Sequence, residues 1–240
     1  MFEVIKYISK NNGPLILHAD LISLGRELIK CRGKLIDKII KESENSYFYI
    51  PTFTFYEDEV FTIDLRSNVS GVLSNELIDN LDKKQYSRTF NPIHSFGFTE
   101  NDMNPSGSNI NTKSFGKGSI FDYFYKENLM QIYLGINPNN SYTIFHHCEA
   151  LVGVKYRRWI TIKKKVKSTD NEDIETVSYQ YFDKIKPIEI NFVKVVNDLV
   201  SKDILKQNNI NKTPILYGKT RTMVDFVCDM ISNNENYLLV

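Results

Sequence analysis

The sequence predicts an α/β fold with a mixed central sheet, helices flanking that sheet and an added β-hairpin. Short apolar strands alternate with amphipathic helical segments along the chain, a pattern typical of α/β proteins. Two longer runs with strand character face each other across a charged turn, which indicates the hairpin. No repeat and no linker rich in Pro, Gly or Ser divides the 240 residues, so we expect a single domain over 1–240.

Four elements are expected in the first part of the chain. Phe2, Ile5 and Ile8 share one helical face, and a brief apolar run after Gly13 suits a buried strand. Aromatic and β-branched residues then indicate a second strand, in which Pro51 marks a bulge or the end. The prediction is a helix over 2–9, a strand over 14–18, a helix over 35–40 and a strand over 47–55.

The middle of the chain, from 91 to 118, is polar and lacks periodicity. A stretch of this length predicts either disorder or a functional loop system. Regular elements are expected again beyond it: a helix over 120–125, a strand over 130–134, a helix over 143–152, hairpin strands over 158–166 and 175–181, a helix over 192–200, a strand over 214–217 and a helix over 222–231.

Composition excludes several classes of protein. The net charge is +1 and the pI is 7.6, so no dominant basic face predicts binding to nucleic acid. Three widely spaced cysteines indicate neither a disulfide framework nor a zinc site, and they favour a reducing compartment. No secretory signal and no apolar run of ~20 residues is found. We therefore expect a cytoplasmic protein without a membrane span, whose oligomeric state stays open, with a homodimer as one alternative.

One segment, Thr143 to Glu149, could carry chemistry. If it is helical, His146 and Glu149 lie three residues apart on the same face. A carboxylate within reach of an imidazole fixes its tautomer and favours its charged form, which is half of a base–orienter arrangement. On spacing alone, a solvated ion pair is the more common meaning of this pattern.

The neighbours of His146 on that helix are expected to be structural. His147 points roughly 100° away, and Cys148 is more typical of a small buried hydrophobe than of a thiolate nucleophile. Adjacent residues of one helix cannot all face one ion, so the segment predicts no metal site.

Two turns are candidates for binding an anion or a ligand. Gly116 to Ser119 precedes a helix, whose first N–H groups favour a phosphate, although Ser119 could instead be an ordinary N-cap. Leu17 to Asp20 ends a buried strand, where ligands of α/β sheets gather. Asp20 could equally cap a helix that begins at Leu21.

Five segments, in this order, resemble the aminoglycoside 3-N-acetyltransferase family. Asp20 replaces the serine, and Asn91 the histidine, that are usual in the first and third of them. The segments are His18 to Gly25, Pro51-Thr-Phe-Thr54, Arg88 to Ser95, Gly116 to Ser119, and Thr143 to Ala150 continued by Arg157 to Thr161.

The resemblance implies an acyltransferase that uses acetyl-CoA as donor and a primary amine of an amino sugar as acceptor, without a metal. It further implies that His146 is the catalytic general base with Glu149 beside it, and that Thr52 or Ser95 steadies an oxyanion. The implied cofactor-binding residues are His18, Ala19, Asp20, Leu21, Thr52, Arg88, Ser95, Gly118 and Ser119, and the implied acceptor-binding residues are Asp64, Glu76 and Glu149.

The charge of the chain indicates which kind of acceptor it favours. A polycationic aminoglycoside would favour an acidic cleft, whereas this chain is balanced and carries Lys113, Lys117, Arg157 and Arg158 near the matching segments. The balance favours a nucleotide-linked amino sugar, as used in the biosynthesis of surface glycans. An aminoglycoside resistance enzyme and a non-catalytic CoA-binding module are the alternatives.

Overall fold

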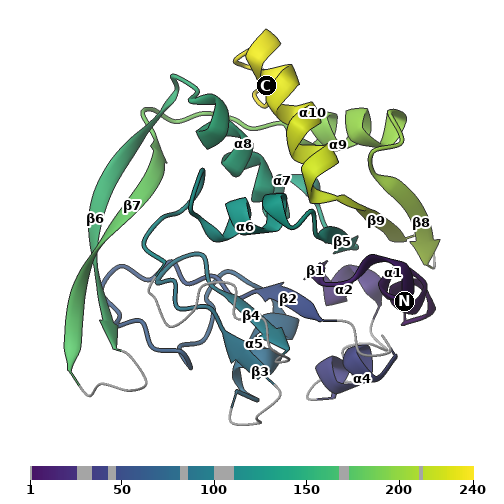
Figure 1. Cartoon of the computed structure of the whole chain (residues 1–240), viewed down its shortest axis with the longest axis horizontal. Helices are drawn as coiled ribbons and strands as arrows, with labels where there is room; N and C mark the ends of the chain where they lie inside the picture. Colours follow the sequence, from purple (N-terminus) through teal and green to yellow (C-terminus); the bar gives the residue numbers. More distant parts are fainter. Residues whose placement is uncertain are drawn as a thin grey trace.

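The computed structural model describes residues 2–25, 34–42, 47–81, 86–99, 111–167, 173–210 and 213–240. Its central feature is a mixed seven-stranded sheet of order β3-β4-β2-β1-β5-β9-β8 (Figure 1). The strands are β1 (Leu15–Ala19), β2 (Phe48–Pro51), β3 (Tyr86–Arg88), β4 (Phe96–Thr99), β5 (Met130–Leu134), β8 (Lys206–Ile210) and β9 (Thr213–Lys219). The predicted fold class, a mixed sheet with helices and an added hairpin, is therefore confirmed.

Helices cover both faces of the sheet. One layer holds α1 (Phe2–Asn12), α2 (Leu21–Leu24), α4 (Leu35–Glu42) and α5 (Val72–Ile78). The other holds α6 (Ile120–Lys126), α7 (Pro138–Ser141), α8 (Ile144–Val152), α9 (Phe192–Ser201) and α10 (Thr220–Asn233). In β1, Leu15 and Leu17 pack into the first layer and Ile16 into the second, because successive strand residues point to opposite faces.

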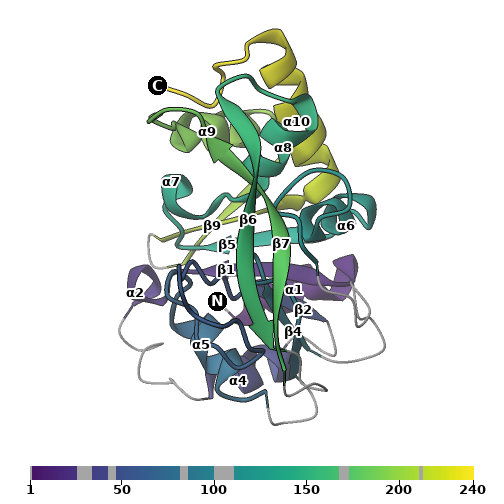
Figure 2. The same ribbon diagram turned by 90° about the vertical axis from the view of Figure 1, so that its left-hand side faces the viewer.

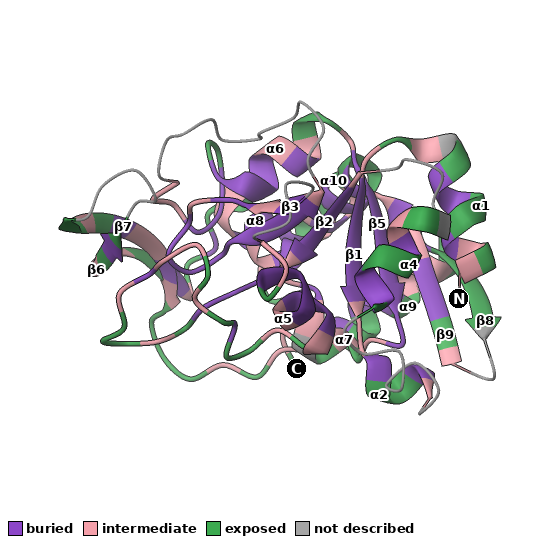
Figure 3. Ribbon diagram, turned by 90° about the horizontal axis from the view of Figure 1, so that it is seen from below, coloured by how far each residue is buried: buried purple, intermediate pink, exposed green. Residues whose placement is uncertain are grey.

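The centre of the sheet is parallel and buried on both faces. β1 pairs in parallel with β2 on one side and with β5 on the other, and all three strands are largely buried (Figure 3). This explains why their sequences read as continuous apolar runs. The chain leaves β1 for β2 and later returns to β5 on the opposite side. Such a reversal opens a crevice at the carboxyl end of β1.

A long antiparallel hairpin, β6 (Arg157–Lys167) with β7 (Ile174–Lys184), stands beside the sheet. Figure 2 shows it running along one side of the molecule, from the end of α8 past the level of the sheet. Its far half is tied to the loop after β2, where the Phe61 N–H donates to the carbonyl of Lys165 at 2.9 Å. The hairpin thereby closes one side of the crevice.

Several elements differ from the prediction. The strand expected over 47–55 ends at Pro51, which has no N–H for a ladder. β4 lies within the segment expected to lack regular structure, and 100–110 of that segment lies outside the described residues. Gly97, inside β4, has no Cβ because the Leu77 side chain fills that space. β3, α5 and β8 were also not predicted, since three to seven residues show too little periodicity.

In the described part of the chain, no helix combines the length and the apolar character needed to cross a membrane.

Candidate active site

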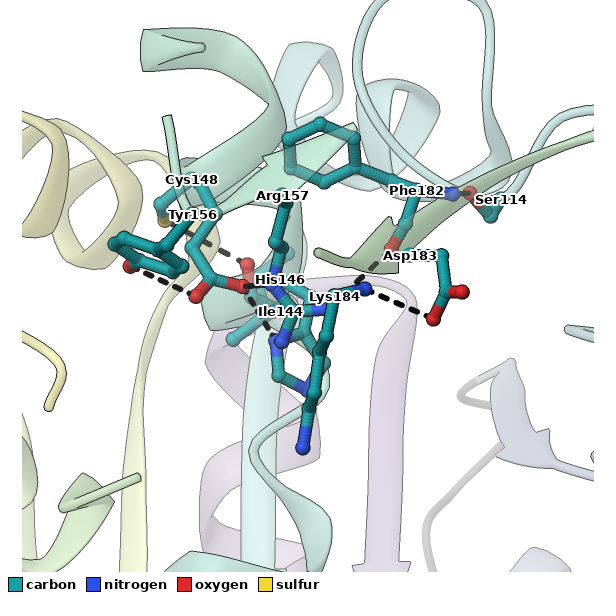
Figure 4. A network of polar contacts seen from close by, with 10 residues as sticks. Ser114, Ile144, His146, Cys148, Tyr156, Arg157, Phe182, Asp183 and Lys184 are labelled. Carbon is teal, nitrogen blue, oxygen red and sulfur yellow. Dashed lines mark hydrogen bonds and ion pairs between the residues drawn. The ribbon is translucent and has the colours of Figure 1, made fainter. Parts of the chain in front are cut away.

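His146 and Glu149 lie on α8, which forms as predicted and ends at Gly153 in the left-handed conformation (φ 79°). Phe145 and Cys148 pack into the core on one face of this helix, which leaves His146 at the edge of the crevice. The imidazole Nδ1 lies 2.6 Å from Oε2 of Glu149 (Figure 4). The two residues therefore form a hydrogen-bonded pair in which Glu149 is buried and His146 is partly exposed, unlike a fully solvated ion pair.

Glu149 is fully buried and surrounded by donors. Oε2 also forms an ion pair with Nε of Arg157 at 2.8 Å, and Oε1 accepts from the Tyr156 hydroxyl at 2.9 Å. Burial by itself would raise the pKa of Glu149, but the hydrogen bond and charge of His146, the charge of Arg157 and the bond from Tyr156 outweigh it and lower that pKa. The carboxylate is thus ionised at neutral pH.

The charge of Glu149 fixes the tautomer of His146. An ionised carboxylate can only accept hydrogen bonds, so the 2.6 Å contact places a proton on Nδ1. Nη2 of Arg157 lies farther from the same nitrogen, at 3.1 Å, and because a guanidinium only donates, that contact is not a hydrogen bond in this tautomer. In the neutral ring, Nε2 then carries a lone pair. The side chain of His146 is 22% exposed, which leaves this second nitrogen accessible. The arrangement presents a base held in one tautomer.

His146 faces a cavity of about 390 Å³ at the carboxyl ends of β1 and β2. The start of α5, the segment before α8 and the base of the β6–β7 hairpin form its other walls. Much of the lining is apolar, including Leu17, Ile50, Phe53, Phe55, Leu73 and Ile136. The cavity can therefore hold an uncharged chain with its reactive end beside His146.

Two further histidines line this cavity. Burial lowers the pKa of His18 to about 4, although the hydrogen bond between its Nε2 and Gln131 acts in the opposite direction. The His18 ring stacks on Tyr133, with the ring centroids 4.8 Å apart. Burial, together with the charge of His146, lowers the pKa of His94 to about 3. Both rings are neutral at physiological pH.

His147 is the packing residue that its position on the helix predicts. It is buried, its Nδ1 accepts from the Gly116 N–H at 3.1 Å, and burial lowers its pKa to about 4. Cys148 is likewise buried and acts as a small core residue.

These three neutral histidines predict that the protein loses stability on mild acidification. In the unfolded chain each of these histidines has a pKa near 6.5 and is protonated below that pH. In the folded protein the same rings stay neutral until the pH falls to about 3 to 4. Their contribution is complete above pH 6.5 and is lost as the pH falls toward 4. Near pH 5 the free energy of unfolding should fall by roughly 3–4 kcal/mol per pH unit. Urea unfolding between pH 7 and 5 measures this slope.

His147→Asn is the matched variant for that measurement, because its amide oxygen can still accept from Gly116 while the titrating ring is gone. About one third of the slope should disappear in this variant. An unchanged slope would contradict the assignment.

The turn before α6 is a helix cap and not an open anion site. Ser119 Oγ accepts from the Asp122 N–H, and the Gly118 N–H donates to Asp122 Oδ2 at 2.7 Å. Lys126 also binds that carboxylate at 2.8 Å. Neither Gly118 nor Ser119 lines the cavity. The geometry supports the N-cap alternative over phosphate binding.

The turn after β1 divides the predicted residues into two groups. His18 and Ala19 line the cavity. Asp20 instead caps α2, accepting from the N–H groups of Ile22 at 3.0 Å and Ser23 at 3.4 Å, and Leu21 is buried beneath the same helix. A carboxylate thus occupies the N-terminus of α2, where it would repel an approaching phosphate.

Thr52, Arg88 and Ser95 form a buried polar cluster behind the cavity wall. Nε of Arg88 lies 3.0 Å from both hydroxyl oxygens, and the rest of the guanidinium donates to main-chain carbonyls. Burial lowers the pKa of Arg88 to about 9, although the negative charge of Asp64 raises it. The guanidinium therefore stays cationic at neutral pH. None of the three lines the cavity. They shape the loop after β2, and their predicted contact with a cofactor or an oxyanion stays a prediction.

Two predicted acceptor-binding residues also lie away from the cavity. Glu76 is buried, and its Oε1 accepts from the N–H groups of Leu35 at 2.6 Å and Ile36 at 3.0 Å, so it caps α4. Asp64 is exposed on the loop after β2. Glu149, the third, is covered by His146, Tyr156 and Arg157.

Sequence reasoning missed several groups at the site. Arg157, Tyr181, Asp183 and Lys184 reach the cavity from the base of the hairpin, and His94 reaches it from the loop before β4. The position of Arg157, just after the turn at Gly153, was the available signal, because a chain that reverses after α8 returns beside Glu149.

Comparison with known proteins identifies the family of the chain. The family model for aminoglycoside 3-N-acetyltransferase matches residues 64–232. A comparison with curated protein sequences finds no match. Among solved structures, AAC-IIIb in a binary complex with CoASH superposes with a TM-score of 0.74 at 14% identity, covering 97% of this chain and 96% of that one.

Two other structures show the same fold. Sisomicin-bound AAC-VIa gives a TM-score of 0.75 at 12% identity, with 97% of each chain covered. The YokD protein from Bacillus subtilis gives 0.71 at 14% identity, covering 98% of this chain and 94% of that one. The family match spans more than half of the 240 residues and includes His146 and Glu149. The chain therefore belongs to the aminoglycoside 3-N-acetyltransferase family and is an acyltransferase.

Proposed function

We propose that this protein transfers an acetyl group from acetyl-CoA to a primary amine of an amino sugar, with His146 as general base. The observation that carries the proposal is the buried Glu149, which holds a proton on Nδ1 of His146 and leaves the lone pair of Nε2 at the cavity. A base positioned in this way is what amine acylation requires, because the attacking nitrogen must lose a proton.

The cavity suits the acyl-bearing arm of the donor. Its apolar walls fit an uncharged chain, and Ala19 and His18 would lie along that arm at the end of β1. The CoASH complex of AAC-IIIb supports the choice of donor. Because Asp20 and Asp122 occupy the two nearby helix N-termini, the donor phosphates would bind elsewhere than at Gly118 and Ser119.

The proposed reaction needs no change of oxidation state. The amine nitrogen attacks the thioester carbonyl carbon, a C–N bond forms, and the C–S bond then breaks. Nε2 of His146 takes the proton that the nitrogen loses, while Glu149 stabilises the resulting imidazolium. The thiolate of CoA takes up that proton as it leaves, which returns His146 to its starting state. Proximity of both substrates supplies much of the remaining acceleration.

The cavity lining carries the charges of Arg157, Asp183 and Lys184, and among these Lys184 supports an acceptor with an anionic group. Arg157 is neutralised by Glu149, whereas Lys184 lines the same cavity as His146. Among the described residues, no ion pair joins its Nζ to a carboxylate, and Oδ1 of Asp183 instead accepts from the Lys184 main-chain N–H. We infer that a nucleotide-linked amino sugar, in surface-glycan biosynthesis, is the preferred acceptor.

An aminoglycoside is the second candidate acceptor, since structures of AAC(3)-IVa with a gentamicin and with apramycin share this fold. An acceptor screen separates the two, with acetyl-CoA as donor and release of free thiol as the readout. UDP-glucosamine and glucosamine 1-phosphate should be acetylated faster than apramycin or sisomicin. The opposite ranking would contradict the nucleotide-linked acceptor, and a lack of thiol release with every amine in the screen would favour a non-catalytic CoA-binding module.

Lys184→Glu should reverse the ranking of acceptors. The substitution places a negative charge in the cavity lining, so kcat/KM for glucosamine 1-phosphate should fall about tenfold and that for apramycin should rise, with both effects weaker at high salt. Lys163→Glu is the matched control, because Lys163 is exposed on the same hairpin and does not line the cavity. Equal effects of the two variants would show that net charge, and not Lys184, sets the preference.

A further inference from the structure

His94 is a buried titratable group that the mechanism above does not use. It lies on the loop before β4 and is 1% exposed, yet it lines the same cavity as His146. Both rings contact Phe115, with centroids 4.8 Å and 5.7 Å from it. The two imidazoles thus approach one cavity from different elements of the fold.

Hydrogen bonds fix which edge of the His94 ring faces the cavity. Nδ1 lies 3.0 Å from the hydroxyl of Tyr179, a residue of β7 that does not line the cavity. Phe53 and Phe55 hold the ring edge-on at 5.2 Å and 5.4 Å. Nε2 is thus the ring nitrogen that Tyr179 leaves free on a residue that lines the cavity, and no described residue gives it a hydrogen-bond partner.

Asn91 determines the tautomer of His94. Its Oδ1 accepts from the N–H groups of Ile93 at 3.0 Å and His94 at 2.6 Å, so this atom is the oxygen of the amide. The Tyr179 hydroxyl lies 3.2 Å from the same oxygen and must donate its only proton there. The contact between Tyr179 and His94 is then a hydrogen bond only if Nδ1 donates.

We propose that His94 contacts the acceptor, with Nε2 accepting a hydrogen bond from the same amine nitrogen that His146 deprotonates. This inference rests on the proposed function. A neutral primary amine has two N–H bonds and one lone pair. With one N–H directed to each imidazole, the lone pair has a single remaining direction, toward the thioester carbonyl. His94 thereby orients the nucleophile, and the low pKa of the ring keeps Nε2 free to accept.

The first test is the protonation state of the ring, measured by ¹⁵N NMR of the imidazole nitrogens in the full-length protein. The signals of His94 are assigned by their loss in His94→Gln. Nδ1 should be protonated and Nε2 should carry the lone pair, and glucosamine 1-phosphate should shift the Nε2 signal. A proton on Nε2, or an Nε2 signal that the amine leaves unchanged, would overturn the inference.

The second test compares three variants with acetyl-CoA and glucosamine 1-phosphate. His94→Phe keeps the ring shape without an acceptor, and the shorter His94→Asn places its amide near Tyr179 only. Both should lose about tenfold in kcat, while His94→Gln, whose amide reaches the former Nε2 position, should keep most of it. Melting temperatures identify variants that are merely unfolded.

Equal kcat values for folded His94→Phe and wild type would overturn the role of His94. Absence of thiol release by the wild type would instead contradict the proposed function. In that case the NMR titration alone decides on His94, because contact between Nε2 and the amine does not require turnover.

Discussion

Replacing His146 with glutamine is expected to lower kcat for acetyl transfer by about 10²–10⁴-fold. The variant keeps a polar side chain of similar reach but cannot take up the proton of the amine. KM for the acceptor should change little, because Nε2 of His146 acts mainly in the transition state, when the amine loses its proton. His94 still binds the amine nitrogen in this variant. Thiol release from acetyl-CoA at saturating acceptor measures the effect.

His147→Asn is the control for this variant. His147 is adjacent on α8, is buried and points to Gly116, so its replacement perturbs the same helix without touching the proposed base. Its kcat should stay within a few-fold of the wild type. An undiminished rate in His146→Gln would remove His146 from its proposed role.

The Glu149→Gln variant is expected to lose both activity and stability. Glutamine can turn its NH2 group toward Nδ1 of His146, so the proton is no longer fixed on that nitrogen, and loss of such an orienting carboxylate can cost about 10⁴-fold. Arg157, whose side chain is 4% exposed, also loses its counter-ion. An uncompensated buried charge destabilises a protein by about 3–5 kcal/mol. Steady-state kinetics and urea unfolding measure the two losses separately.

The double variant Glu149→Gln with Arg157→Gln distinguishes the two losses. Removing the unpaired guanidinium should restore much of the stability but none of the catalysis, because the tautomer of His146 stays unfixed. Recovery of kcat along with stability would mean that Glu149 supports the fold alone and does not orient the base.

The strands and helices that carry strong local signals could be predicted from sequence, as could the pairing of His146 with Glu149. The apolar runs of β1 and β5, the helical spacing of α8 and the paired runs of the hairpin all lie where they are expected. His146 and Glu149 could be found because both members lie on one turn of one helix. Their burial could not, since it depends on Tyr156 and Arg157 folding back after Gly153.

Residues joined only by the tertiary structure escaped prediction. His94, Lys184 and His146 are separated in sequence, and the loop before β4, the hairpin and α8 bring them to one cavity. Ligand binding by Arg88, Glu76 and Ser119 stays a prediction, and the structure gives their polar side chains another role. Each instead satisfies buried main-chain groups or neighbouring side chains, a demand that sequence position does not reveal.

A structure of the protein with CoA bound tests most directly whether His146 acts as base on an amine attacking the thioester. The account predicts that the sulfur lies in the cavity at the carboxyl ends of β1 and β2, with room for one amine between it and Nε2 of His146. A sulfur bound outside that cavity, or one separated from His146 by intervening side chains, would contradict it.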